Sequence, residues 1–231
     1  MATITRCASV AAAQQYAAER SATRIAEAIA ARGRCTIVLA GGNTPAGMYR
    51  RLAAEPLRST IDWSRVIVLW GDERYVPLDH ADSNYRVAHE TLLTAVPLLP
   101  AQLFPMPVWR ENPHEAAQSY AHDVTAQLAA GGGQLDLVLL GMGPDGHTAS
   151  LFPLHPALTT TDLVTVVRDA PKPPPLRLTL ALPALNTARH VLFLVTGSDK
   201  AATLRAVLDG APGYPAGRVQ PRQGDVEWVV G

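Results

Sequence analysis

A titratable pair of side chains follows an apolar stretch in the middle of this 231-residue chain. Residues 135–140 (LDLVLL) are almost entirely apolar, and a glycine-rich loop then presents Asp145 and His147 two positions apart. Histidine, with an ordinary pKa of about 6.5, suits proton transfer at neutral pH, and a neighbouring carboxylate can orient the ring and stabilise its charged form. Ligands bind at the carboxyl ends of strands in open parallel sheets. Residues 135–153 are therefore the predicted centre of an active site, with His147 and Asp145 catalytic. A structural histidine is the alternative.

A second glycine turn, AGGNTP at residues 40–45, ends the apolar run 35–42. Thr44 suits a helix N-cap and Pro45 suits the first helical turn, so a strand, a glycine turn and a helix N-terminus are predicted in succession. The exposed N–H groups and the helix dipole of such a turn favour phosphate. The predicted phosphate-binding residues are Gly41, Gly42, Asn43 and Thr44. An ordinary turn between a strand and a helix is the alternative.

Charged side chains are also placed where strands are predicted to end. Residues 65–76 (RVIVLWGDERYV) are predicted to form one buried strand that opens into Asp72 and Arg74. The guanidinium of Arg74 can hold a carboxylate, a phosphate or a developing oxyanion, whereas Asp72 can act as a base or hold Arg74. Lys200 and Arg177 are candidate phosphate-binding cations beside two later strands. Solvated charges are the alternative for all of them.

Other chemistries fit these residues poorly. The glycines of 141–146 match the dinucleotide fingerprint, but Pro153 and Pro156 lie where a long helix should pack, and Asp145 would face a pyrophosphate. The sequence contains neither a GxSxG nucleophile elbow nor a GxxxxGK[ST] phosphate loop. No spacing of Cys, His or acidic residues matches a known metal site. We therefore expect no metal and no cofactor.

The composition limits the class of protein. Apolar residues make up 48% of the chain and charged residues 17%, which is typical of a globular protein. The formal net charge of +0 argues against nucleic acid as a partner, and no run of about 18 apolar residues predicts a membrane span. Two cysteines, Cys7 and Cys35, are expected to be free and buried, and the first residues do not resemble a signal peptide. We expect a cytoplasmic monomer or weak homodimer, and the predicted site suits a small phosphorylated substrate.

Predicted strands and helices alternate along the chain. This alternation predicts an α/β fold, a three-layer α/β/α sandwich with a mainly parallel sheet, in one domain over residues 1–231. The order after residue 160 is less regular and admits antiparallel strands. The proline-rich segment 171–175 is predicted to be rigid and extended. Helices are expected over 9–33, from Thr44 to near Pro56, after Ser83, over 113–131 and over 200–208, and further strands over 163–168, 176–181 and 190–196.

Five motifs occur in an order that resembles the 6-phosphogluconolactonase family: GGNTP, GDERYVPLDHADSNY, LDLVLLGMGPDGHTASLFP, PPPLRLTL and VTGSDK. The resemblance covers residues 35–210, and the third motif is the most specific. It implies hydrolysis of 6-phospho-D-glucono-1,5-lactone to 6-phosphogluconate in the oxidative pentose phosphate pathway. It also implies an α/β/α fold shared with glucosamine-6-phosphate deaminases and ribose-5-phosphate isomerases.

The resemblance also implies roles for residues that match the motifs. His147 is similar to the family's catalytic histidine, Arg74 to its substrate-contacting arginine and Lys200 to its substrate-binding lysine. The related deaminases read GHIAFNEP at the third motif, with a glutamate five residues after the histidine, where this chain has Phe152. Because Phe152 cannot donate a proton, the lactonase branch is favoured over amino-sugar isomerisation.

Overall fold

The computed structural model describes residues 2–231, and within them seven strands form one parallel sheet in the order β1-β10-β9-β6-β2-β3-β5. Three further strands form a small antiparallel sheet in the order β4-β8-β7. The strands of the large sheet are β1 (Ala2–Arg6), β2 (Cys35–Leu39), β3 (Val66–Trp70), β5 (Leu103–Phe104), β6 (Leu137–Leu140), β9 (His190–Val195) and β10 (Asp225–Val230). Those of the small sheet are β4 (Asp72–Arg74), β7 (Val164–Val167) and β8 (Arg177–Leu180). The predicted fold class is confirmed, and the antiparallel strands make a separate sheet.

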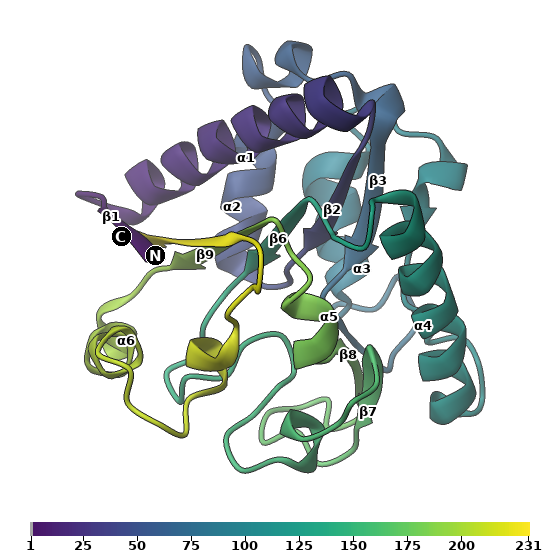
Figure 1. Cartoon of the computed structure of the whole chain (residues 1–231), viewed down its shortest axis with the longest axis vertical. Coiled ribbons are helices and arrows are strands. Elements are labelled where there is room, and N and C mark those ends of the chain that lie inside the picture. Colours follow the sequence, from purple (N-terminus) through teal and green to yellow (C-terminus); the bar gives the residue numbers. More distant parts are fainter. Residues whose placement is uncertain (1) are drawn as a thin grey trace.

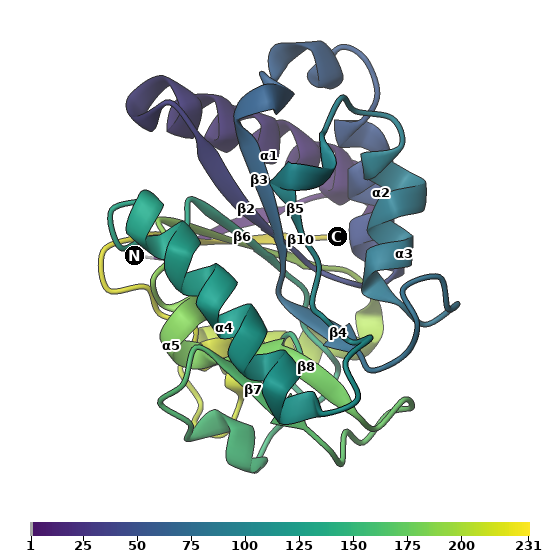
Figure 2. The same ribbon diagram turned by 90° about the vertical axis from the view of Figure 1, so that its right-hand side faces the viewer.

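Helices cover both sides of the large sheet. The helices are α1 (Val10–Arg32), α2 (Asn43–Leu52), α3 (Asn84–Ala88), α4 (Pro113–Ala130), α5 (Leu182–Leu185) and α6 (Ala201–Leu208). Helices α1 and α2 lie together on one side, whereas α4, α5 and the small sheet lie on the other (Figures 1 and 2). This arrangement is the predicted three-layer sandwich.

The long helix α1 begins and ends where the sequence predicts. The Ser9 side chain accepts a hydrogen bond from the N–H of Ala12, and Gly33, with a φ of 73°, donates its N–H to the carbonyl of Ile29. Serine is a favoured N-cap and glycine a favoured left-handed C-cap. The buried side of the helix is rich in alanine, so the helix backbone packs closely against the sheet.

The predicted strand over 65–76 is instead two strands, β3 and β4, that belong to different sheets. The chain crosses between the sheets at Gly71. Its N–H donates to the carbonyl of Leu39 in β2, and its carbonyl accepts from the N–H of Leu180 in β8. The apolar strand β3 therefore ends at Trp70, before Gly71. The charged segment β4 pairs with β8 and does not extend β3.

The sequence did not predict β1, β10 or the one-turn helix α5. Strands β1 and β10 bring the two ends of the described chain together at one edge of the large sheet (Figure 1). Strand β1 is mostly exposed, so its apolar content is low and gives little signal. Cys7, which follows β1, is half-buried rather than buried, whereas Cys35 is buried as expected, and both thiols are free.

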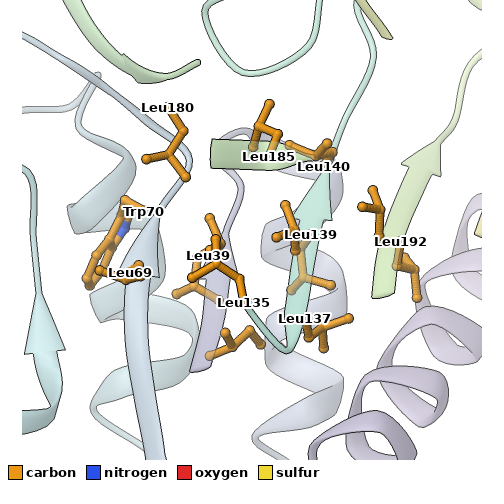
Figure 3. Close-up of a cluster of buried hydrophobic side chains, with 14 of the residues drawn as sticks. Leu39, Leu69, Trp70, Leu135, Leu137, Leu139, Leu140, Leu180, Leu185 and Leu192 are labelled. Atoms are coloured by element: carbon orange, nitrogen blue, oxygen red, sulfur yellow. The ribbon is translucent and has the colours of Figure 1, made fainter. Parts of the chain in front are cut away.

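The order of the strands creates a switch point between β6 and β2. From β2 the chain moves to β3 on one side, and from β6 it moves to β9 on the other. The carboxyl ends of these four strands lie in register at one edge, where Leu39 pairs with Trp70 and Leu140 with Phe193. Buried leucines from the strands fill the core beneath this edge (Figure 3). A ligand site is expected at such a crevice.

At the amino ends of the central strands, the buried Asp136 precedes β6 and holds the start of β2. Its carboxylate accepts from the N–H of Thr36 at 2.8 Å and pairs with Arg32 at 2.8 Å.

Asp136→Ala is expected to lower the free energy of unfolding by about 1–3 kcal/mol, because the Thr36 N–H loses its acceptor. Glu27→Ala, which breaks an exposed pair with Arg24, should cost below about 1 kcal/mol. Urea unfolding of both variants tests this, and equal losses would contradict it.

Candidate active site

A cavity of ≈ 340 Å³ opens at the carboxyl ends of β2, β3, β6 and β9. It lies at the switch point, and it is lined by the glycine turns that follow β2 and β6. Nine of the ten predicted site residues line it: Gly41, Gly42, Asn43, Thr44, Asp72, Arg74, His147, Arg177 and Lys200. The tenth, Asp145, is hydrogen-bonded to the ring of His147. The fold therefore brings together residues that are far apart in the sequence.

The Asp145–His147 pair is held by its own glycine loop. Nδ1 of His147 lies 2.5 Å from Oδ1 of Asp145, which also accepts from the backbone N–H of His147 at 3.2 Å. The N–H of Gly143 donates to the carbonyl of His147 at 2.9 Å and closes the loop. A Cβ on Gly143 would collide with both the imidazole and the carboxylate. Glycine at this position is therefore a requirement of the pair.

The environment of His147 favours a neutral ring. Burial lowers the pKa of His147 below its ordinary value, and the hydrogen bond and charge of Asp145 oppose this shift. Burial raises the pKa of Asp145, but the hydrogen bond and charge of His147 outweigh it, so the pKa of Asp145 is lowered. Because an ionised carboxylate accepts the Nδ1 proton, Nε2 carries the lone pair that a general base needs.

The turn after β2 supplies backbone N–H groups at the start of α2. The helix begins at Asn43, and the N-cap is Gly42, whose φ of 101° favours glycine. The prediction that Thr44 is the N-cap is therefore wrong. The Thr44 hydroxyl is instead 2.9 Å from the hydroxyl of Thr196, which joins the first turn of α2 to the end of β9. This contact links the phosphate turn to the loop that carries Lys200.

Asp72 lies in the floor of the cavity with its carboxylate already engaged. One oxygen accepts from the hydroxyl of Ser150 at 2.6 Å, and the other accepts from the side-chain amide of Asn84 at 3.1 Å. Asp72 is buried and forms no ion pair with Arg74 among the described residues, so the predicted holding of Arg74 is wrong. The other amide atom, Oδ1 of Asn84, is buried at the cavity without a hydrogen-bond partner in residues 2–231.

Arg74 is positioned by the backbone around Glu73. The buried carboxylate of Glu73 accepts the N–H groups of Arg74, Asn84 and Tyr85 at 2.7–2.8 Å and the hydroxyl of Ser83 at 3.0 Å. It therefore ties β4 to the first turn of α3. Burial raises the pKa of Glu73, and the three N–H donors oppose this shift. Glu73 does not line the cavity, but it holds two residues that do.

Two arginines from the small sheet lie side by side, since Arg74 and Arg177 are directly paired between β4 and β8. Arg74 donates to the carbonyl of Asp82 at 2.6 Å, and its Nε is buried without a partner in the described chain. Arg177 is buried and holds the proline segment: it donates to the carbonyls of Lys172 and Pro174 at 2.7 and 3.0 Å. The segment 171–175 is therefore a bent loop held against β8, and the prediction that it is extended is wrong.

Sequence reasoning missed three polar residues of the cavity, Asn84, Lys172 and Asp199. Asn84 lies in one of the five motifs but carries no charge, and only the fold brings it to Asp72. Lys172 lies inside the proline-rich segment 171–175, whose four prolines predict backbone rigidity and give no sign of a binding role for the lysine. Lys200, which was predicted, lies half-buried on the opposite loop, and burial lowers its pKa while Asp199 opposes the shift.

Comparison with known proteins assigns the chain to a family. A model of the family described as Glucosamine-6-phosphate isomerases/6-phosphogluconolactonase matches residues 8–228. The chain belongs to this family. The 6-phosphogluconolactonase of Synechocystis sp. is 44% identical over 215 residues, which are 90% of this chain and 86% of that protein. The 6-phosphogluconolactonase of Streptomyces coelicolor is 41% identical over 85% of this chain and 79% of that protein.

Solved structures of the family share the fold. The 6-phosphogluconolactonase of Thermotoga maritima superimposes with a TM-score of 0.89 at 30% identity, and the match covers 100% of both chains. A monomeric glucosamine-6-phosphate deaminase superimposes with a TM-score of 0.83 at 20% identity, and the match covers 99% of this chain and 97% of that one. This second likeness extends to the fold alone.

Phe152 packs against the ring of His147. The centroid of the Phe152 ring lies 4.7 Å from that of the His147 ring. The guanidinium carbon of Arg177 lies 5.6 Å from the same Phe152 centroid. The buried phenyl ring is therefore close to both the guanidinium and the imidazole, and it contributes to the burial that lowers the pKa of His147.

Two general properties of the described chain bear on the site. Within residues 2–231, His, Cys, Asp and Glu side chains form no group of three or more that could hold a metal ion. None of the helices in the same residues combines the length and hydropathy that a membrane-crossing segment requires.

The Asp145–His147 contact predicts a pH effect. Asp145→Asn removes the charge that raises the pKa of His147, so the acid limb of the kcat profile should move to lower pH. The asparagine amide can also donate to Nδ1 and leave the proton on Nε2, so kcat should fall by about 10²–10⁴-fold. Asp225→Asn is the matched control, because Asp225 pairs with His190 at 2.9 Å outside the cavity. An unchanged profile in Asp145→Asn would contradict the assignment.

The Glu73 clamp predicts a loss of stability. Glu73→Gln keeps the shape but turns an NH₂ group toward hydrogen-bond donors, so the free energy of unfolding should fall by about 1–3 kcal/mol. Glu90→Gln is the control, since Glu90 forms an exposed pair with Arg86 and its loss should cost below about 1 kcal/mol. Chemical denaturation measures both, and a Glu73→Gln variant as stable as the control would show that the clamp carries no energy.

Proposed function

We propose that this protein hydrolyses 6-phospho-D-glucono-1,5-lactone to 6-phosphogluconate. The observation that carries the proposal is that the Asp145–His147 pair and the glycine turn at the start of α2 open on one cavity. A helix N-terminus suits a phosphate, and a histidine with a lowered pKa suits activation of water. The family and the named lactonases at 41–44% identity support this substrate.

In the proposed binding mode, the phosphate and the lactone ring of the substrate occupy different parts of the cavity. The substrate phosphate accepts N–H groups of residues 41–44 and is attracted by Lys200. This anchoring directs the lactone C1 carbonyl toward His147, which lies on the loop after the neighbouring strand β6. Arg177 donates to two backbone carbonyls and to the Ser150 hydroxyl, and it acts by holding the loop around Lys172.

The proposed chemistry is attack of water on the C1 carbonyl. Nε2 of His147 removes a proton as the water oxygen bonds to C1, and the carbonyl oxygen becomes negatively charged. Arg74 or nearby backbone N–H groups stabilise this oxyanion. When the bond from C1 to the ring oxygen breaks, His147 returns the proton to that oxygen, and the carboxylic acid product ionises in solution. Asp145 holds the ring and stabilises its charged form between the two steps.

Amino-sugar isomerisation is the competing activity within the family. That reaction needs proton transfer to open the sugar ring. The position five residues after His147 is Phe152, which lies against the imidazole and cannot transfer a proton. Lactone hydrolysis requires no further acid, because His147 can serve both steps. We therefore expect no conversion of glucosamine 6-phosphate.

Substitution of His147 tests the proposal. His147→Ala should lower kcat by about 10²–10⁴-fold, the ordinary contribution of general acid–base catalysis. His190→Ala, which removes a histidine of a similar pair outside the cavity, should retain kcat. Rates are measured as acid release from the lactone and corrected with a protein-free blank, because the lactone also hydrolyses unaided. A His147→Ala variant with the wild-type kcat would remove His147 from the mechanism.

We also propose that the enzyme works in the cytoplasm as a monomer or weak homodimer, without nucleic acid as a partner. Two free cysteines are typical of a reducing compartment. The formal net charge is +0, which gives no general attraction to nucleic acid. The large apolar side chains that are exposed are few and scattered: Ile4, Val10, Leu99, Trp109 and Leu154.

A further inference from the structure

The chain contains only two lysines, Lys172 and Lys200, and both line the catalytic cavity. The other 18 of its 20 basic residues are arginines. Arginine therefore fills nearly every basic position of the protein, and lysine is found only where two loops face the site. A compact ammonium group binds a phosphate as a point charge, whereas a guanidinium offers a planar fork of donors.

The two lysines come from different loops, before β8 and after β9, and are positioned differently. Lys172 lies in the segment 171–175, whose carbonyls at Lys172 and Pro174 are held by the buried Arg177. A hydrogen bond from the N–H of Ala170 to the carbonyl of Pro175 closes the base of this segment. The backbone of Lys172 is therefore fixed while its side chain is exposed to the cavity.

The charges around the two lysines are not balanced by ion pairs. Neither ammonium group forms a salt bridge with an acid in residues 2–231. Burial is the main reason that the pKa values of Lys200 and His147 are lowered, and the nearby charge of Lys172 lowers both further. Two ammonium groups that face one cavity repel each other. A bound dianion attracts both of them and offsets this repulsion.

We infer that Lys172 and Lys200 form a two-ammonium clamp that closes on the substrate phosphate from opposite sides of the cavity, with Arg177 as the residue that positions Lys172. This inference rests on the proposed function. The N–H groups of residues 41–44 supply the third side of the phosphate site, because the Thr44–Thr196 contact keeps the start of α2 beside the loop of Lys200. A ligand therefore needs a phosphate group to bind tightly at this site.

Neutral variants test the clamp through binding. Lys172→Met and Lys200→Met should each raise KM for the phosphorylated lactone and the Kd of 6-phosphogluconate by about tenfold or more, the usual effect of losing a charge-assisted hydrogen bond. The kcat of Lys172→Met should remain near that of wild type. Arg222→Met is the matched control, because Arg222 is exposed and lies outside the cavity, and it should change neither constant. A Lys172→Met variant that loses kcat at unchanged KM would place Lys172 at the lactone carbonyl and overturn the clamp.

Amine-selective labelling gives a second readout that does not need turnover. Reductive methylation can modify only the two lysines and the terminal amine, so mass spectrometry can follow each lysine of the wild-type protein separately. Saturating 6-phosphogluconate should slow the labelling of Lys172 and Lys200 together. Labelling of Lys172 that is unaffected by this ligand in an active enzyme would overturn the clamp alone. Protection of both lysines in a protein without turnover above the blank would overturn the lactonase proposal alone.

Discussion

The parallel alignment of four neighbouring strands is the constraint on which the site depends. Strands β9, β6, β2 and β3 end at one edge, so each following loop opens toward the same crevice. The chain diverges on either side of the β6–β2 boundary, which leaves room there for a ligand. The glycine turn after β2 and the Asp145–His147 loop after β6 flank this boundary. Their proximity is a consequence of sheet topology, and neither loop needs a direct contact with the other.

The small antiparallel sheet adds what the parallel sheet cannot supply. At Gly71 the chain leaves β3 and pairs with β8, which places Arg74 beside Arg177 at the rim of the cavity. Glu73 then fixes this strand to the start of α3 through three hydrogen bonds, from Ser83, Asn84 and Tyr85. Much of the polar network serves to hold backbone, and Arg177 is the best example, because its donors bind carbonyls of the loop that carries Lys172. Two of the buried polar atoms without partners in residues 2–231, Nε of Arg74 and Oδ1 of Asn84, belong to residues that line the cavity.

Most of the layer architecture and nearly all of the site could be predicted from local sequence. Apolar runs, helix caps such as Ser9 and Gly33, and glycine turns are local signals, and they placed the strands that carry the site. The errors arose where distant partners decide the outcome. The break at Gly71 depends on Leu180 of β8, and the helix start at Gly42 depends on a backbone φ that Thr44 does not control. Lys172 was missed because its role requires a partner that holds its loop.

The central claim is that one cavity holds a phosphate at the start of α2 while it presents a carbonyl carbon to His147. A crystal structure of the protein with bound 6-phosphogluconate tests this most directly. We predict the phosphate against the N–H groups of Gly42 and Asn43, and the C1 carboxylate about 3–3.5 Å from Nε2 of His147, the distance of reacting groups. A complex in which C1 lies at the turn of residues 41–44, or in which the imidazole does not face the sugar acid, would contradict the account.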